Sequence, residues 1–128
     1  FTEETENKII ELLKPTYIKG LTLLGGEPFE PQNQKALLPF IKKIREIYKD
    51  TKNIWSYTGF VYDKDLVKGG RAYTDCTDEL LSLIDILVDG PFIEAKKNIM
   101  LKFRGSSNQR VIDLKNTLKL GKICLYLQ

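Results

Sequence analysis

Cysteine is scarce in this chain of 128 residues, which contains only Cys76 and Cys124. The two residues lie too far apart in sequence for a metal-binding spacing, and two cysteines provide no disulfide framework. We therefore expect two free thiols. The sequence also lacks Gly-x4-Gly-Lys-Ser/Thr and Gly-x-Gly-x2-Gly, so a nucleotide-binding α/β domain is a weaker alternative for its function.

Long apolar runs are absent as well. None approaches the roughly 18 residues of a membrane span, and no basic start followed by an apolar segment resembles a signal peptide. Lys and Arg exceed Asp and Glu by only 20 to 17, which favours neither nucleic acid nor a membrane as a partner. With 42% hydrophobic and 29% charged residues, we expect one cytoplasmic domain over residues 1–128.

The chain begins at Phe1, and its only methionine is Met100. Thr2 followed by acidic residues is typical of a helix N-cap and first turn, which predicts a helix over residues 3–14 that ends before Pro15. We expect that a further segment precedes Phe1 in the native protein. A mature protein cleaved from a signal peptide is the competing explanation.

Two more helices are predicted from apolar periodicity and capping residues. Asn33 is the expected N-cap of a helix whose apolar stripe runs from Leu37 to Tyr48, with Pro39 expected to kink it or delay its regular start. Thr77 is the expected N-cap of a shorter helix that ends at Leu83.

Strands alternate with these helices along the first two thirds of the chain. β-branched and aromatic runs predict strands over 21–24, 54–58 and 84–89. This alternation favours an α/β fold with a parallel sheet and right-handed crossovers. The tail departs from the pattern, because 99–103 and 122–127 alternate like strands, with a polar loop and a weak helical patch between them.

Glycine and polar residues follow each of the first three strands, as Gly25-Gly26-Glu27-Pro28, Ser56-Tyr57-Thr58-Gly59 and Asp89-Gly90-Pro91. Ligands of parallel α/β proteins bind at the carboxyl ends of the strands. Paired glycines let backbone approach a ligand, and a desolvated carboxylate gains about 1.5–3 kcal/mol per hydrogen bond from an ammonium group. We therefore expect an amino-acid-like ligand at Glu27, with a plain strand-to-helix turn as the alternative.

Four ordered blocks carry a resemblance to a known family: residues 23–33, 54–60, 84–92 and 104–109. Gly25-Gly26-Glu27-Pro28 resembles the Gly-Gly-Glu segment of radical S-adenosylmethionine enzymes, which contacts the amino group of the methionine moiety. The blocks together are similar to the anaerobic ribonucleoside-triphosphate reductase-activating proteins. They extend over residues 21–109, which is most of the chain.

The resemblance implies a fold and a reaction. Members form an incomplete (β/α) barrel and bind a [4Fe-4S] cluster through three cysteines, with S-adenosylmethionine on the unique iron. The 5'-deoxyadenosyl radical then takes a hydrogen atom from a glycine of the partner, anaerobic ribonucleoside-triphosphate reductase. A low-potential electron donor such as flavodoxin is also implied, whereas nucleic acid and membrane are not.

The chain departs from this family in its cysteines. The Cys-x3-Cys-x2-Cys loop that precedes the Gly-Gly-Glu segment is absent from the sequence, and Cys76 and Cys124 cannot replace it. The resemblance therefore implies a partial barrel that is incomplete at its N-terminus, with no metal ligand in these residues. A non-catalytic fragment or subunit that binds the partner is the alternative.

Residue roles follow from the resemblance only where the sequence matches it. Gly25, Gly26 and Glu27 are expected to bind the methionine ammonium, and Pro28 to fix the turn. Ser56 and Thr58 are candidates for contact with polar atoms of the cofactor, with Tyr57 packing and a capping hydroxyl as the structural alternative. Asp89 is a candidate for binding ribose or a cation, or else a turn cap before Gly90.

The last candidate site is a polar loop with one guanidinium, two hydroxyls and two amides. Its composition suits an anion or an extended backbone, such as the cofactor carboxylate or the partner's glycine loop, although a surface turn is an equally simple reading. Trp55 is expected in the core because strand tryptophans contribute mainly through buried area. The loop residues are Arg104, Ser106, Ser107, Asn108 and Gln109.

Overall fold

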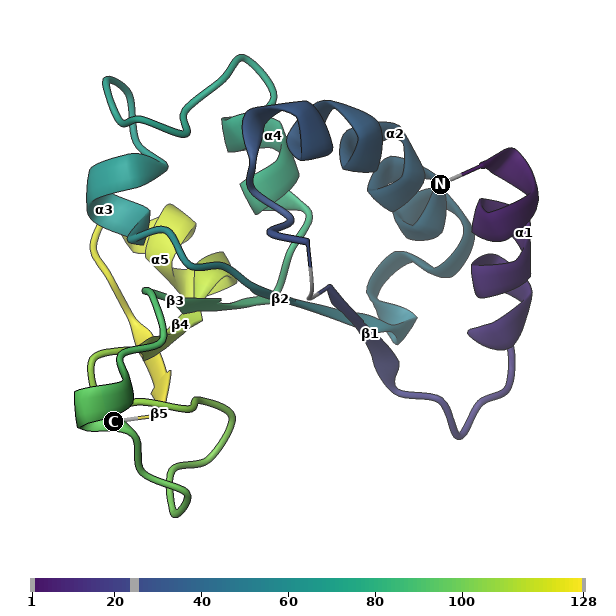
Figure 1. The fold of residues 1–128 in the computed structure, drawn as a ribbon. Coiled ribbons are helices and arrows are strands. Elements are labelled where there is room, and N and C mark those ends of the chain that lie inside the picture. The colour runs from purple at the N-terminus through teal and green to yellow at the C-terminus, as the bar shows by residue number, and fades with distance from the viewer. Residues whose placement is uncertain (1, 24–25, 128) are drawn as a thin grey trace.

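Five strands form one mixed sheet in the computed structural model, which describes residues 2–23 and 26–127 (Figure 1). Their order in the sheet follows their order in the chain. β1, β2 and β3 are parallel, whereas β4 and β5 are antiparallel to their neighbours. The predicted α/β fold is confirmed, and the parallel sheet is limited to the first three strands. The strands are β1 (Gly20–Leu23), β2 (Asn53–Tyr57), β3 (Ile86–Asp89), β4 (Arg110–Asp113) and β5 (Leu125–Leu127).

The tail differs most from the prediction. The strand expected over 99–103 is wrong, because these residues lie in a loop that follows the short 3-10 helix η2 (Glu94–Lys96). The edge of β3 that β2 leaves free is taken by β4, which follows this segment in the chain. The missed strand β4 lies further along, and the weak helical patch is α5 (Leu114–Leu120).

Helix α1 (Glu3–Leu12) begins as expected, since the Thr2 hydroxyl accepts a hydrogen bond from the Thr5 amide at 3.2 Å. The predicted cap of the second helix is wrong: α2 (Pro31–Tyr48) follows Glu30, and Asn33 lies inside it. Pro39 is also inside α2, which continues past it as one helix. Pro39 is exposed, so the carbonyl that its missing N–H leaves unpaired faces solvent.

The third predicted helix is shifted by one residue. Cys76 occupies the N-cap position of α4 (Thr77–Ser82), and Thr77 is its first residue. The Thr77 hydroxyl instead accepts a hydrogen bond from the Thr74 amide and contacts the amide oxygen of the fully buried Gln34 at 2.5 Å. Two short helices, η1 (Lys49–Thr51) and α3 (Tyr62–Asp65), were not predicted.

The helices cover one face of the sheet, and the loop that contains η2 lies on the other side (Figure 1). Alternation along β2 places Ile54 in the main core under the helices and Trp55 on the opposite face. There the Trp55 ring meets the rings of Phe103 and Tyr126, with centroids 4.9 and 5.5 Å away. Trp55 therefore belongs to a second, smaller apolar cluster and is only half-buried. No helix in the described ranges has both the length and the apolar character needed to cross a bilayer.

Candidate functional site

The turn after β1 places a carboxylate at the edge of the sheet. Gly26 and Glu27 both have positive φ, at +41° and +39°, a conformation that costs a non-glycine residue about 1 kcal/mol or more. The side-chain amide of Asn33 donates to the carbonyls of Gly26 and Glu27 at 2.7 and 2.9 Å, which offsets that cost. Leu24 and Gly25 lie outside the described residues, so the expectation for Gly25 stays a prediction.

Three donors hold the Glu27 carboxylate. The Thr58 hydroxyl and the Phe29 amide donate to Oε2 at 2.7 and 2.9 Å, and the Gly59 amide donates to Oε1 at 2.6 Å. An ionised carboxylate has about four acceptor positions, so Oε1 keeps the capacity for a further donor. Within residues 2–23 and 26–127, no Lys or Arg forms an ion pair with Glu27.

A cleft of about 320 Å³ opens beside this carboxylate. It brings together the tips of β1, β2 and β3, as the sequence predicted for the carboxyl ends of parallel strands. Glycines keep it open: a Cβ on Gly59 would lie 3.3 Å from Glu27 Oε1. The lining residues are Gly26, Glu27, Pro28, Tyr57, Thr58, Gly59, Gly90, Phe92 and Gln109.

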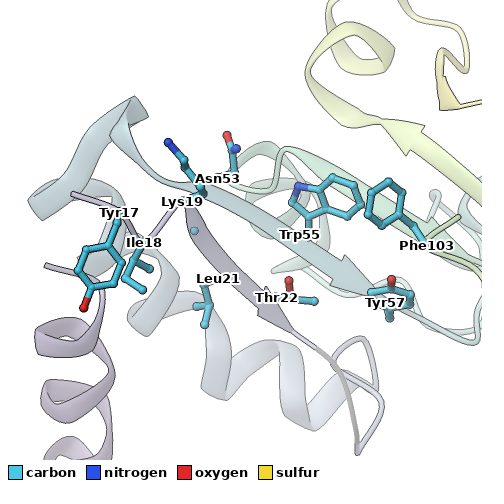
Figure 2. A pocket seen from close by; sticks show the side chains of 10 residues that line it. Tyr17, Ile18, Lys19, Leu21, Thr22, Asn53, Trp55, Tyr57 and Phe103 are labelled. Atoms are coloured by element: carbon cyan, nitrogen blue, oxygen red, sulfur yellow. The ribbon is translucent and has the colours of Figure 1, made fainter. Parts of the chain in front are cut away.

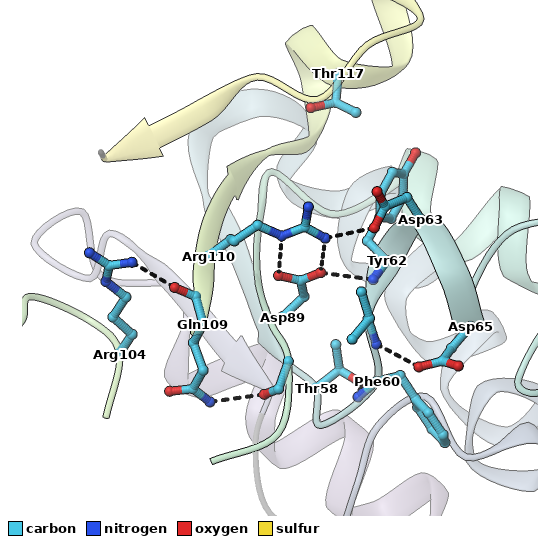
Figure 3. Close-up of polar contacts among 12 residues, drawn as sticks. Thr58, Phe60, Tyr62, Asp63, Asp65, Asp89, Arg104, Gln109, Arg110 and Thr117 are labelled. Carbon is cyan, nitrogen blue, oxygen red and sulfur yellow. Dashed lines mark hydrogen bonds and ion pairs between the residues drawn. The ribbon is translucent and has the colours of Figure 1, made fainter. Parts of the chain in front are cut away.

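Ser56 and Asp89 do not line this cleft. Ser56 is fully buried within β2. Asp89 is 1% exposed and forms a bidentate pair with Arg110, whose Nε and Nη2 lie 3.0 and 2.5 Å from the two carboxylate oxygens (Figure 3). The Tyr62 amide supplies a third donor at 2.8 Å. Asp89 thus has its cation within the chain.

Arg110 also ties α3 to the tip of β3. Its Nη2 lies 2.9 Å from Asp63, which is at the start of α3. The hydrogen bond to Asp89 is the main reason that the pKa of Arg110 is raised above its ordinary value. The hydrogen bond from Arg110 in turn lowers the pKa of Asp63. This cluster is a structural clamp at β3, separated by β2 from the strand that leads to Glu27.

The loop from Arg104 to Gln109 is cross-linked through the Gln109 side chain. Its Oε1 accepts from the amides of Gly105 and Ser106 at 2.8 and 3.1 Å, and its Nε2 donates to the Gly90 carbonyl at 3.0 Å. Arg104 Nη1 donates to the Gln109 carbonyl at 2.6 Å. Of the predicted loop residues, only Gln109 borders the cleft.

The other loop residues attach the segment to its surroundings. Asn108 Nδ2 donates to the Pro91 carbonyl at 2.7 Å, while its Oδ1 is buried without a hydrogen-bond partner. The buried Ser106 hydroxyl accepts from the Ile93 amide at 3.2 Å. Ser107 is exposed. These bonds connect both ends of the segment between β3 and β4.

A larger hollow of about 450 Å³ runs along the helix-free face of β1 and β2 (Figure 2). Tyr57 borders both this hollow and the Glu27 cleft, so the two adjoin. Burial raises the pKa of the Tyr57 hydroxyl. The other residues that line the hollow are Tyr17, Ile18, Lys19, Gly20, Leu21, Thr22, Asn53, Trp55 and Phe103.

The described residues do not fit an iron-sulfur cluster. Cubane iron is held by cysteine thiolates that converge on one point. The sequence has only Cys76 and Cys124, which are free and partly exposed. In the described part of the chain, no three metal-ligating side chains come together.

Two residues important for the site were missed or misread from the sequence. Asn33 was expected to cap α2, yet its amide holds the turn at Glu27. The backbone of Gly59 was expected only to end a strand, yet it binds the carboxylate. Asn33 joins α2 to the turn after β1, and Gly59 joins the end of β2 to the same turn. Apart from the glycine after β2, no local sequence pattern predicts these contacts.

Comparison with known proteins identifies the class. Residues 1–112 match the family model described as a 4Fe-4S single cluster domain.

Named relatives identify the family more specifically than the family model does. An anaerobic ribonucleoside-triphosphate reductase-activating protein of Haemophilus influenzae is 42% identical over 85% of this chain and 66% of its own length. The protein of the same name from Escherichia coli K12 is 37% identical over 90% of this chain and 70% of its own. The chain belongs to the family of anaerobic ribonucleoside-triphosphate reductase-activating proteins, as its sequence predicted.

A more distant relative carries the same name. The anaerobic ribonucleoside-triphosphate reductase-activating protein of Enterobacteria phage T4 is 32% identical over 87% of this chain and 64% of its own length. The chain thus spans about two thirds of the length of these relatives. No solved structure matched the chain.

Proposed function

We propose that this chain is the cofactor-binding part of an enzyme that activates anaerobic ribonucleoside-triphosphate reductase. The activity is formation of a glycyl radical on the reductase, with S-adenosylmethionine as the radical source and a [4Fe-4S] cluster as the electron relay. The names of the relatives support the partner, and the family model supports the cluster. The observation that carries the ligand assignment is the Glu27 carboxylate, oriented by three neutral donors and unpaired with any described cation.

The ammonium of the methionine moiety is the ligand group that Glu27 suits. The free acceptor capacity on Oε1 faces a cleft whose walls include three glycines. A cation there would neutralise the carboxylate, and each charge-assisted hydrogen bond would contribute about 1.5–3 kcal/mol. Because the cleft adjoins the larger hollow at Tyr57, a ligand longer than an amino acid has room to extend along the sheet.

The other candidate residues take different parts in this proposal. Gly25 and Gly26 admit the ligand, Pro28 shapes the turn, and Thr58 orients the Glu27 carboxylate. Ser56 and Asp89 support the strand tips from within, since one is buried in β2 and the other is paired with Arg110.

The polar loop lies on the far side of the cleft. We assign Gln109 to its wall, next to the Gly90 carbonyl that it binds. Arg104, Ser107 and Asn108 then form the adjoining surface toward the partner's glycine loop, and the buried Ser106 supports it through its hydrogen bond from Ile93. The hydrogen bonds that connect this segment give that surface a defined shape.

The remaining parts of the proposal concern groups outside these residues. Three cluster thiolates would have to come from outside this 128-residue sequence, which has only two cysteines. The parallel β1–β2–β3 unit supports a partial (β/α) barrel of the radical S-adenosylmethionine type. A low-potential donor such as flavodoxin would supply the electron. The proposed location of the enzyme is the cytoplasm.

The count of cysteines also favours a second candidate, a subunit that binds the reductase without chemistry of its own. Anaerobic reconstitution of the complete protein with iron and sulfide separates the two. The enzyme predicts cluster absorbance and cleavage of S-adenosylmethionine under a reductant. A protein with neither would be the binding subunit.

Glu27→Gln tests the ligand assignment directly. We expect S-adenosylmethionine to bind about tenfold more weakly or worse by calorimetry, since about 1.4 kcal/mol corresponds to tenfold. Methylthioadenosine, which lacks the amino-acid moiety, should bind the wild type and Glu27→Gln equally.

The control is Glu46→Gln, an exposed position on α2. It should leave both affinities unchanged. Equal affinity of the wild type and Glu27→Gln for S-adenosylmethionine would remove Glu27 from the site.

A further inference from the structure

The loop between β3 and β4 presents apolar side chains to solvent. All residues from Phe92 to Met100 are exposed, and Ile99 and Met100 at its tip are 87% and 83% exposed. Two adjacent large apolar side chains this open are unusual on a small domain, whose exposed apolar residues are normally scattered. Phe92 and Phe103, at the two ends of the loop, are about half exposed.

The net charge of this loop equals the net charge of the whole chain. Residues 92–104 contain four cations and one acid, a net charge of +3 that equals the total for the protein. The remaining residues carry 16 cations and 16 acids. Among the described residues, no carboxylate forms an ion pair with Lys96, Lys97 or Lys102.

The base of this loop is held in place beside the Glu27 cleft. Lys97 and Ser106 form an isolated antiparallel bridge, and the Ser106 hydroxyl accepts from Ile93. The Phe103 ring lies against Trp55 on the sheet (Figure 2). Phe92 itself lines the cleft. A partner bound to the loop tip would therefore reach the cleft without a rearrangement of the base, which lowers the entropic cost of docking.

We propose that residues 92–104, the docking loop, bind the protein substrate of this enzyme at an acidic surface with an apolar recess that receives Ile99 and Met100. This inference rests on the proposed function, because the cleft beside the loop must be where the partner reacts. Apolar anchors inside a charged rim are the usual anatomy of a specific interface. Unpaired lysines would speed association with an acidic partner, and salt would slow it.

Charge favours this partner over a second copy of the chain. Outside the docking loop the chain carries as many cations as acids, so a second copy has no excess of acid to attract the loop. A lipid surface suits the loop less well, because the segment has only one 3-10 turn and no amphipathic helix.

The test compares two loop variants with matched controls in the complete protein. The apolar variant is Ile99→Ser with Met100→Ser, and the charge variant is Lys96→Glu with Lys97→Glu. Their controls are Leu12→Ser, at an exposed position on α1, and Lys8→Glu with Lys35→Glu, on α1 and α2. The probe is purified anaerobic ribonucleoside-triphosphate reductase, with binding measured by interferometry at two salt concentrations.

We expect each loop variant to bind the reductase about tenfold more weakly, with the charge variant losing mainly salt-sensitive association rate. The controls should stay within about twofold, and every variant should keep its melting temperature and its affinity for S-adenosylmethionine. Unchanged binding by both loop variants would overturn the docking assignment while leaving the proposed function intact.

Three other results also decide the matter. Failure of the wild type to bind reductase would refute the proposed partner itself. A wild-type dimer that the loop variants convert to monomer would assign the loop to self-association instead. Binding of the wild type, but not of the loop variants, to anionic phosphatidylglycerol vesicles in place of the reductase would assign it to a membrane surface.

Discussion

Two carboxylates at the tips of β1 and β3, on either side of β2, have different surroundings. Glu27 and Asp89 each accept three hydrogen bonds. The donors to Glu27 are two backbone amides and a hydroxyl, whereas Asp89 faces the guanidinium of Arg110. A carboxylate that is oriented but lacks a cation is available to a cationic ligand, and one already paired is part of the scaffold. The surroundings, not the residue type, separate a carboxylate that can accept a cation from one that already has its own.

The largest expected effect is on stability, from Asp89→Asn. It leaves Arg110 with only the exposed Asp63, at a site where Asp89 is 1% exposed. Breaking a buried pair costs about 3–5 kcal/mol, and the partial exposure of Arg110 reduces this to about 2–3 kcal/mol. Urea unfolding measures the loss. If Asp89→Asn lost no more stability than Glu27→Gln does in the same assay, the distinction between the two carboxylates would be wrong.

Asn33→Ala tests whether the turn holds Glu27 in place. It removes both hydrogen bonds to the Gly26 and Glu27 carbonyls, and we expect about 1–2 kcal/mol of lost stability. S-adenosylmethionine should also bind several-fold more weakly, because Glu27 no longer has a fixed orientation. Gln32→Ala, at the exposed neighbouring position, should change neither quantity. Full ligand affinity in Asn33→Ala would show that the turn needs no clamp.

Thr58→Val separates orientation from charge. The substitution keeps the shape of a buried side chain but removes the donor to Glu27 and the acceptor for the Phe60 amide. We expect about 1 kcal/mol of lost stability and a few-fold weaker binding of S-adenosylmethionine by calorimetry. Thr58→Ser restores the hydroxyl and should recover the ligand affinity. No recovery would mean that packing, not the hydrogen bond, is responsible.

Asp63→Asn gives the smallest effect, because the Asp63 side chain is 50% exposed. At neutral pH we expect a loss of at most about 0.5 kcal/mol after allowance for solvent screening. The hydrogen bond from Arg110 lowers the pKa of Asp63, so its contribution is present above the unfolded pKa of about 3.9 and is lost as the pH falls through the folded value. Unfolding measured from neutral pH to pH 2 should show the wild type and variant converging in acid. A gap that widens in acid would contradict this sign.

Local pattern predicted much of the fold because it reports burial and chain direction. The first three strands, the three main helices and the Thr2 cap follow from apolar periodicity and turn residues near each other in sequence. The segment 99–103 shows the limit of this signal. Its alternation suits a strand, yet the next strand to pair with β3 is the later segment Arg110–Asp113, and that choice is a property of the whole sheet.

The candidate site shows the same division. The glycines, Glu27 and Thr58 were predicted at strand ends, and the structure brings the described ones together in one cleft. The role of Asn33 was misread because a residue near a helix start suits a cap, and its bonds to the preceding turn depend on how the chain folds back. Ser56 was placed with the site because it shares a strand face with Thr58 two residues later. It lies within β2, not at its end, and is fully buried there.

The sequence by itself determined which chemical groups this protein brings to the ends of its parallel strands, since glycine, carboxylate and hydroxyl positions follow directly from the apolar runs before them. Only the tertiary structure decided which carboxylate is left for a ligand. Arg110, on the antiparallel strand β4, neutralises Asp89, and no described cation reaches Glu27. The physical reason is that the strength of a charge pair depends on distance in space, which strand pairing sets and local sequence does not.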